Sequence, residues 1–478
     1  MTEYDAVVVG AGPNGLVAAV TLATEGHKVL LLEGSDAFGG GLRSDELTLP
    51  GFRHDVGATV MAMALASPAM RELGVEKDGV EWAHPPVPAA HPLDAGHGPA
   101  VLVHRDLART AEGLGRDGAA WRATVGATAR AGFPLVDTLL APLSVPRAPV
   151  RAARFGVLGV LPATVLARTA FRTERARAAF AGMAAHSMLD LGAPITSGYG
   201  LMLASSAHLV GWPVVRGGAQ ELADALVSRL VRLGGEAVTG HPVKSLAELP
   251  PTRTTILNLT PRQIVQVAGD RLPGAYRRKL ERFRYGPGVF KVDWALDGPV
   301  PWRDPEVGTA GTVHLGGALD EIAYAEAEVA RGRHAERPYV LVVQPTVADP
   351  TRAPAGKHIL WAYCHVPNGS TSDMTEIIED QIERFAPGFR DLILARSVLN
   401  PADLERRNAN LVGGDIGGGS AALSQFIRRP VYSPRPWATP VPGLFISSAS
   451  TPPGAAVHGM GGRQAARLAI KALAGGRR

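Results

Sequence analysis

The feature that most constrains the fold is a glycine-rich turn between two short apolar runs near the N-terminus. Residues 5–9 (DAVVV) form a continuously apolar run, which is typical of a strand covered on both faces. The turn Gly10-Ala11-Gly12-Pro13-Asn14-Gly15 follows, and a helical pattern of apolar residues then continues to about Gly26. Residues 28–32 (KVLLL) form the second run. This order predicts a βαβ unit.

Each glycine of the turn has a separate physical task in a dinucleotide site. Gly10 permits the tight turn, Gly12 lets the backbone approach a pyrophosphate, and Gly15 allows the helix to pack closely on the strand. Glu33 ends the second apolar run, where a carboxylate accepts hydrogen bonds from adenosine ribose hydroxyls and disfavours a 2′-phosphate. The nucleotide-binding residues predicted in this region are Gly10, Gly12, Pro13, Asn14, Gly15, Glu33 and Gly34.

A second glycine cluster indicates FAD in preference to NAD. The sequence Gly39-Gly40-Gly41-Leu42-Arg43-Ser44 resembles the second glycine motif of the amine oxidase and phytoene desaturase flavoprotein superfamily. In that superfamily an arginine usually follows the glycine pair and meets the pyrophosphate. Here Gly41 has that place, so either Arg43 takes the role or solvent fills the space. The resemblance implies that Gly40, Gly41 and Arg43 contact FAD; the alternative is a flexible glycine loop.

Residues 443–460 (GLFISSASTPPGAAVHGM) resemble the closing flavin motif of the same superfamily. A strand would lead to the ribityl chain, and a last helix, expected from about Val457 to Leu473, would point its free amides at the flavin. Those amides would stabilise the negative charge that grows at flavin N1 and O2 on reduction. The resemblance implies these further cofactor-binding residues: Val243 through its backbone, Ser450, Val457, His458, Gly459 and Met460.

With both ends matched, the resemblance covers the whole chain and is nearest to the phytoene dehydrogenase-related proteins of bacteria. It implies an α/β fold: a Rossmann-type, glutathione-reductase-like FAD-binding domain with an inserted substrate domain of mixed sheet and helical cap. The expected divisions are 1–57 (FAD-binding, first part), 58–213 (helical cap and substrate region), 214–275 (FAD-binding, second part), 276–410 (substrate-domain sheet and helix) and 411–478 (FAD-binding, C-terminal part).

Hydrophobic periodicity predicts the remaining main elements. Expected strands cover residues 238–246, 255–259, 289–296, 339–344 and 358–366, and expected helices cover residues 220–233 and 375–386. The region from about Ala58 to Pro213 contains many prolines, few convincing strands and several helices rich in Ala, Leu and Arg.

Two residues near the expected flavin are candidates for catalysis. Lys291 occupies the place where amine oxidases have a lysine that holds a water against flavin N5, and its charge could help oxygen react with reduced flavin; the alternative is a lysine on the polar face of a strand. His458 lies at the flavin end of the last helix, as a proton carrier or as a helix cap. We expect His186, His208 and His365 to be structural.

The leading functional interpretation is dehydrogenation of a mostly apolar small molecule, with hydride transfer to flavin N5 and reoxidation by oxygen or a quinone, because no second nucleotide fingerprint is visible. A flavin amine oxidase is the second interpretation, supported by Lys291. The sequence does not identify the aromatic pair that normally flanks the amine, although Trp294, Trp361 and Tyr363 are available for it. The third is a flavoprotein that acts mainly by binding a partner.

Composition excludes several classes of function. The net charge of +5 and the pI near 9.4 come from arginines spread among acidic residues, without a basic block, so we expect no nucleic-acid partner. The single cysteine, Cys364, excludes a dithiol redox pair and therefore a disulfide reductase, and we expect no metal ion.

The location of the protein is also predicted from sequence. The first strand starts almost at once, which leaves no room for a signal peptide and favours the cytoplasm. No stretch is long and apolar enough to span a bilayer. Residues 151–180 mix apolar and arginine side chains, so this helix pair either lies on a membrane surface or forms a solvent-exposed cap.

Overall fold

The computed structural model describes residues 3–142 and 148–475. The predicted βαβ unit is present as β1 (Tyr4–Val9), α1 (Pro13–Thr24) and β2 (Val29–Leu32). It belongs to a parallel five-stranded sheet that draws on distant parts of the chain. In spatial order the strands are β16 (Leu444–Ile446), β10 (Thr252–Leu257), β1, β2 and β9 (Glu236–Val238).

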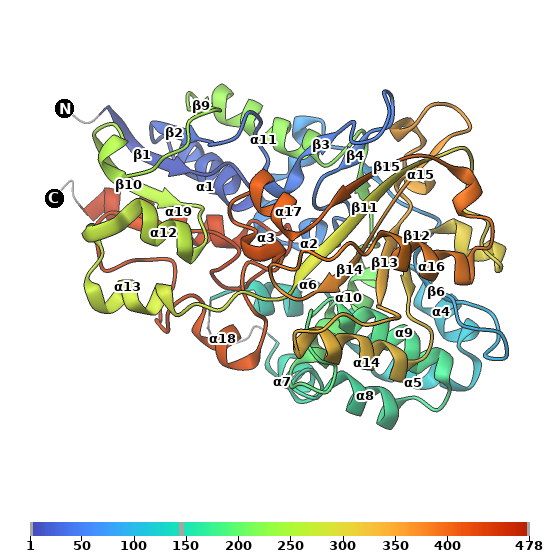
Figure 1. Cartoon of the computed structure of the whole chain (residues 1–478). Coiled ribbons are helices and arrows are strands. Elements are labelled where there is room, and N and C mark those ends of the chain that lie inside the picture. Colours follow the sequence, from blue (N-terminus) through green and yellow to red (C-terminus); the bar gives the residue numbers. More distant parts are fainter. Residues whose placement is uncertain (1–2, 143–147, 476–478) are drawn as a thin grey trace.

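Helices cover both faces of this sheet, which explains why its central strands are continuously apolar. One face packs against α1, α11 (Gln220–Arg232) and α19 (Met460–Gly475), and the other packs against α12 (Pro261–Ala268) and α13 (Gly274–Glu281). The first strand, β1, and the last helix, α19, both lie at the left of Figure 1, where α1 and α19 are neighbours. The predicted α/β fold class is confirmed.

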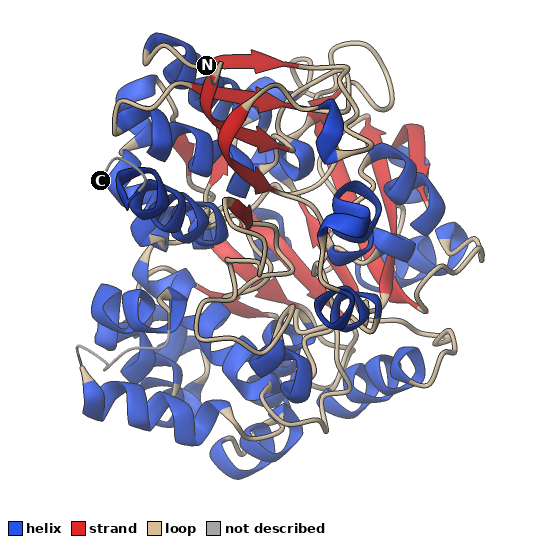
Figure 2. Cartoon of the chain, turned by 90° about the vertical axis from the view of Figure 1, so that its left-hand side faces the viewer, coloured by secondary structure: helices blue, strands red, loops and turns tan. Residues whose placement is uncertain are grey.

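A seven-stranded mixed sheet forms the second layer (Figure 2). In spatial order its strands are β15 (Ile393–Leu399), β11 (Gly288–Leu296), β14 (His358–Val366), β13 (Val340–Val343), β12 (Ala310–Leu315), β6 (Val87–His91) and β7 (Val101–Val103). β6 and β7 come from the region where few strands were expected. β6 (VPAAH) contains proline and two alanines, which are poor strand formers, and it becomes a strand because all five residues are buried beside β12.

Helices form the lower part of the molecule in Figures 1 and 2. They are α5 (Gly118–Ala123), α6 (Val125–Leu140), α7 (Pro149–Gly159), α8 (Ala163–Ala170), α9 (Glu174–Ala185), α10 (Thr196–Leu209) and α14 (Leu319–Ala330). Within residues 3–142 and 148–475 no single helix is long and apolar enough to cross a membrane; α7 and α8 together reach the length and composition of a span, but they are bent by 102°.

The remaining elements are short, apart from α16 (Thr375–Phe385), which packs on the seven-stranded sheet. They include α2 (Ala62–Ala66), α3 (Pro68–Leu73), α4 (Leu107–Gly113), α15 (Pro345–Ala348), α17 (Pro401–Arg407), α18 (Leu423–Arg428), β3 (Ser44–Asp45), β4 (His54–Asp55), β5 (Trp82–Ala83) and β8 (Val214–Val215).

Three predicted elements have wrong bounds. The strand expected over residues 238–246 ends at Val238. The strand expected over residues 255–259 is β10, Thr252–Leu257. The last helix starts at Met460 instead of Val457, because Ala456 and Gly459 have φ values of +99° and +67°, which an α-helix cannot contain.

Candidate functional site

The glycine turn after β1 has the close packing that its sequence predicts. Gly10 has a φ of +94°, and a Cβ atom at Gly15 would lie 1.9 Å from the carbonyl oxygen of Gly10. Gly12 is the N-cap of α1, with Pro13 next to it and no side chain capping the first amides. A helix start of this kind is an anion-binding site.

Glu33 lies beside this turn at the carboxyl end of β2. One carboxylate oxygen accepts a hydrogen bond from the N–H of Ala11 at 2.7 Å, and the other accepts from the N–H of Ser35 at 3.0 Å. The half-buried carboxylate therefore connects the glycine turn to the loop after β2.

The segment after β9 borders the same edge of the sheet. The N–H of His241 donates to the carbonyl oxygen of Glu33 at 2.8 Å, and the Cα of Pro242 lies 3.3 Å from the Cβ position of Gly34. Val243 follows as a partly buried residue in a loop. The structure thus brings Val243 to the same edge as Glu33 and Gly34.

The second glycine cluster packs against the first. A Cβ at Gly40 would lie 3.0 Å from the Cα of Gly12, whereas a Cβ at Gly41 would have no atom of the described residues within 4 Å. The side chain of Arg43 forms an ion pair with Asp36 at 3.0 Å. The place of the family's arginine is therefore open space at Gly41, and Arg43 already has an acidic partner.

The two ends of the chain meet at this turn. The side-chain oxygen of Asn14 accepts from the N–H of Gly462 at 3.4 Å, and a Cβ at Gly462 would lie 1.8 Å from the backbone oxygen of Asn14. This contact holds the start of α1 beside the start of α19.

His458 caps the last helix. Its side chain is 1% exposed; its Nδ1 accepts from the N–H of Met460 at 3.1 Å, and its Nε2 lies 3.1 Å from the carbonyl oxygen of Gly454. Burial lowers the pKa of His458 to about 4, so the ring is neutral at pH 7 and donates from Nε2. This geometry matches a helix cap, and it occupies an amide that was expected to face the flavin.

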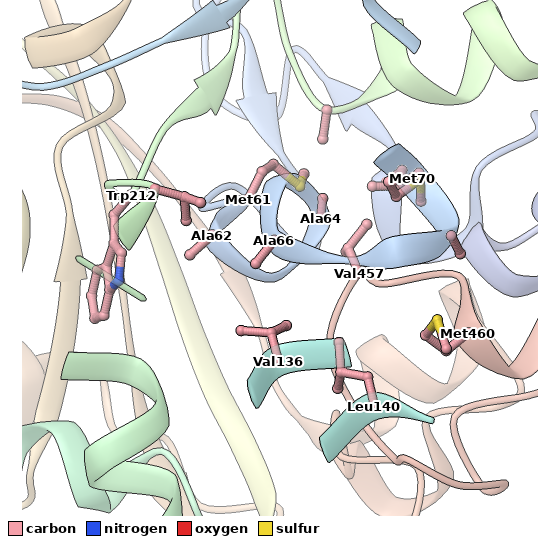
Figure 3. Close-up of a cluster of buried hydrophobic side chains, with 14 of the residues drawn as sticks. Met61, Ala62, Ala64, Ala66, Met70, Val136, Leu140, Trp212, Val457 and Met460 are labelled. Carbon is pink, nitrogen blue, oxygen red and sulfur yellow. The ribbon is translucent and has the colours of Figure 1, made fainter. Parts of the chain in front are cut away.

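A buried apolar cluster fixes this turn in place. Figure 3 shows Val457 between the α2–α3 segment and the end of α6, with Met460 nearby. The hydroxyl of Ser67, at the start of α3, donates to the carbonyl oxygen of His458 at 2.5 Å. The labelled side chains of the cluster include Met61, Met70, Val136, Leu140, Val457 and Met460.

Ser450 leads to a segment that sequence reasoning missed. Its hydroxyl donates to the carbonyl oxygen of Gly418 at 2.8 Å. Gly418 belongs to residues 413–419 (GGDIGGG), where the buried carboxylate of Asp415 accepts hydrogen bonds from three backbone N–H groups, each at 2.7 Å. Five glycines in seven residues were a visible signal for a site of close backbone approach.

Asn258, at the end of β10, was also missed. Its side-chain amide donates to the carbonyl oxygen of Gly10 at 3.1 Å, so it supports the first glycine turn from the neighbouring strand. The signal was its position at the carboxyl end of a predicted strand, where ligands of parallel sheets bind.

Lys291 lies in a strand with no exposed residue, so it is not on a polar strand face. Its ammonium forms an ion pair with the carboxylate of Asp293 and donates to the carbonyl oxygen of Asp55 at 3.1 Å. The ammonium also lies 5.2 Å from the ring centroid of Trp361. Nδ1 of His54 lies 3.4 Å from Asp293. Lys291 therefore connects the seven-stranded sheet to the N-terminal part of the chain through a buried network.

A row of rings extends from Lys291 along the same face of the sheet. The rings of Trp361 and Tyr363 are stacked, with centroids 5.8 Å apart and an interplanar angle of 20°. The row continues through His365, Tyr339, His314 and His186. Trp294 points to the opposite face and donates to Glu379 at 3.0 Å.

Each histidine expected to be structural has a protein partner. His186 lies 3.0 Å from His314, His208 lies 3.1 Å from the indole N–H of Trp121, and His365 lies 2.8 Å from the buried carboxylate of Glu326. Burial lowers the pKa of His186 to about 3, which keeps that ring neutral.

Cys364 is buried in β14, and burial raises the pKa of its thiol. The thiol therefore stays protonated and is shielded from redox partners.

Three comparisons with known proteins agree with this geometry. The family model described as "NAD(P)-binding Rossmann-like domain" matches residues 8–74. Pyridine nucleotide-disulfide oxidoreductase domain-containing protein 2 of Rattus norvegicus is 27% identical, with 98% of this chain and 94% of that protein covered. Phytoene desaturase (neurosporene-forming) of Rhodobacter capsulatus is 25% identical over 95% of this chain and 91% of the relative.

Solved structures share the fold over the whole chain. Putrescine oxidase bound to putrescine superimposes with a TM-score of 0.62 and 17% identity, covering 98% of this chain and 99% of the oxidase. Cyclohexylamine oxidase from Brevibacterium oxydans gives a TM-score of 0.59 and 15% identity, covering 99% and 100%. The chain is therefore an oxidoreductase homologous to phytoene desaturase, with the fold of the amine oxidase and FAD-dependent oxidoreductase superfamily.

Proposed function

We propose that the protein binds FAD and dehydrogenates a mostly apolar small molecule by hydride transfer to flavin N5, with oxygen or a quinone as the electron acceptor. The observation that carries this proposal is the meeting of the two terminal motifs, since Asn14 of the first contacts Gly462 of the last helix. Similarity to phytoene desaturase over most of the chain supports dehydrogenation.

The residues present fit the cofactor. The uncapped start of α1 suits the pyrophosphate, Glu33 suits the ribose, and the open space beside Gly41 leaves room for the chain that joins the two halves of FAD. The buried hydroxyl of Ser447, at the end of β16, has no hydrogen-bond partner among the described residues, which is consistent with a ligand at that strand end.

Bound flavin would supply the hydride acceptor, and the chain would supply position, charge and exclusion of water. Lys291 is held by Asp293 and Asp55, so its charge stays fixed on the face of the seven-stranded sheet that carries Trp361. His458 has both ring nitrogens engaged with backbone groups and is neutral, so it serves as the cap that orients the last helix.

The test is anaerobic reduction of the purified yellow protein by a panel of isoprenoids, acyl compounds and amines, followed at the flavin absorption band. Bleaching by an apolar isoprenoid or acyl compound is the expected result. A colourless polypeptide that does not take up added FAD would refute the proposal.

An amine oxidase is a second candidate, favoured by the buried Lys291. The rings of Trp361 and Tyr363 stack on each other, which differs from a facing pair that would hold an amine between them. Bleaching by amines alone in the same panel would select this candidate. A flavoprotein that mainly binds a partner is the third, and any rapid bleaching by a small molecule excludes it.

The cap also supports a proposal of peripheral membrane contact. Val150, Val157 and Val165 on α7 and α8 are 81%, 69% and 43% exposed, and Arg151 and Arg154 are exposed beside them. Apolar and cationic side chains on one helical surface favour binding to anionic lipid. Co-sedimentation with anionic vesicles that Val157→Asp abolishes is the expected result, whereas equal sedimentation of both proteins would contradict the contact.

A further inference from the structure

Two arginines are buried among the residues that the structure describes, and they differ in their partners. Arg352 is 0% exposed and forms an ion pair with Asp55. Arg429 is 2% exposed, and within residues 3–142 and 148–475 no carboxylate lies within 4.0 Å of it. Its Nε is buried and has no hydrogen-bond partner in the part of the chain that the structure describes.

The described protein groups around Arg429 hold the side chain without forming an ion pair with it. Nη2 donates to the carbonyl oxygens of Gly417, Gly418 and Gly419 at 3.1, 2.9 and 3.1 Å. The carboxylate of the same loop, Asp415, lies within electrostatic range of the guanidinium but forms no ion pair with it among the described residues. It accepts hydrogen bonds from backbone N–H groups, and burial raises its pKa, which disfavours its charged form. A buried cation is strongly destabilising unless a negative charge pairs with it closely, so this environment favours an additional anionic group beside Arg429.

The position of Arg429 points to the ligand. A Cβ at Gly454 would lie 2.9 Å from Nη1, so the guanidinium rests against the C-terminal motif at a residue that has no side chain. The charge of Arg429 contributes to the lowered pKa of His458, and the phenol of Tyr199 is also within its electrostatic range. The N–H of Met460 donates a hydrogen bond to His458, so this amide at the start of the last helix is not free to stabilise an anionic ligand.

We propose that Arg429 binds an anionic oxygen of a ligand at this end of the site. The inference rests on the proposed flavin site. Two ligands there have this chemistry: the pyrimidine ring of reduced flavin, where negative charge accumulates, and a carboxylate carried by the apolar substrate.

The experiment uses the yellow holoenzyme and the substitution Arg429→Gln, which keeps an N–H donor for the loop carbonyls but removes the charge. The matched control is Arg428→Gln, which removes the same charge from an exposed neighbour. Sulfite probes the flavin, because its addition leaves negative charge on the pyrimidine ring and bleaches the yellow colour. Decanoate, compared with decanol, probes a carboxylate site through the flavin spectrum.

A loss of about tenfold or more in sulfite affinity for Arg429→Gln, with decanoate affinity retained, assigns the anion to the flavin. A loss of decanoate affinity with sulfite affinity retained assigns the anion to a substrate carboxylate. A loss of affinity for both sulfite and decanoate supports one site that the flavin and the substrate carboxylate share. Affinities within about twofold of the Arg428→Gln control for both probes would overturn the proposal. A colourless wild-type protein would instead refute the proposed function.

If Arg429→Gln does not retain flavin, the wild-type holoenzyme decides. Tight sulfite binding, or a clear preference for decanoate over decanol, supports the proposal. Absence of sulfite binding at millimolar concentration, together with equal affinity for decanoate and decanol, overturns it.

Discussion

The buried ion pair between Lys291 and Asp293 makes a prediction with a defined magnitude. Their side chains are 4% and 0% exposed, and Asp293→Asn keeps the shape of the carboxylate while removing its charge. The ammonium would then be left with uncharged acceptors, which are the carbonyl oxygen of Asp55 and the side-chain oxygen of the introduced amide. Breaking a buried pair by removing one partner lowers the free energy of unfolding by about 3–5 kcal/mol.

The same strand offers a matched control. Asp297 follows the end of β11 and pairs with Lys357, and these side chains are 51% and 38% exposed. Because solvent screens an exposed pair, Asp297→Asn is expected to change the free energy of unfolding by about 0–1 kcal/mol. Urea unfolding of each variant, followed by tryptophan fluorescence, measures the difference.

A third variant separates loss of charge from loss of packing. Lys291→Met combined with Asp293→Leu replaces the pair by apolar side chains, and we expect it to be more stable than Asp293→Asn alone. The free energies of unfolding of Asp293→Asn and Asp297→Asn could instead agree within about 1 kcal/mol. That result would refute the inference that Asp293 is the buried counter-ion on which the Lys291 ammonium depends.

Four further predictions test the site residues. In Gly15→Ala the new Cβ would lie 1.9 Å from a backbone oxygen, so we expect the free energy of unfolding to fall by about 3 kcal/mol or more and the protein to lose FAD on gel filtration. In Gly41→Ala the new Cβ would lie in open space, so the free energy of unfolding should change by less than about 0.5 kcal/mol. The pKa of His458 is about 4 in the folded protein, below its unfolded value of 6.5. The contribution of the neutral ring to the free energy of unfolding is therefore complete above pH 6.5 and falls by about 1.4 kcal/mol per pH unit towards pH 4. When unfolding is measured over a series of pH values, His458→Asn should show a shallower decline than the wild type. Ala456→Gly should raise the free energy of unfolding by about 1 kcal/mol in the same assay, because Ala456 has a φ of +99°, and an unchanged or lower value would contradict strain at this position. Lys291→Met should slow reoxidation of reduced flavin by oxygen in stopped-flow measurements, and an unchanged rate would remove its proposed role.

Sequence predicted the parts of the fold that are specified by local patterns. The apolar runs around Gly10 and the periodicity of residues 220–233 each encode an element within one segment, and the structure has both elements close to their expected bounds. β6 was missed because its proline and alanines carry no local strand signal and its pairing with β12 joins residues far apart in the chain.

The residues of the candidate site also fall into those that local sequence patterns reveal and those that only the fold reveals. The glycines of the first turn were recognisable because their spacing is local, and the ion partner of Lys291 was within reach of the same reasoning, since residues two apart on a strand share a face. The isolation of Arg429 was not visible, because it depends on which acids the fold brings near and on which backbone groups already occupy Asp415.

The strand order of the five-stranded sheet has a consequence for how the polypeptide matures. Its edge strand, β16, is encoded by residues 444–446, while β1 and β2 leave the ribosome first. A nascent chain that stops short of these residues lacks both that edge and the helix that closes over Asn14. On the proposed function, cofactor loading is therefore a late event in biosynthesis, and we expect prematurely terminated chains to be colourless.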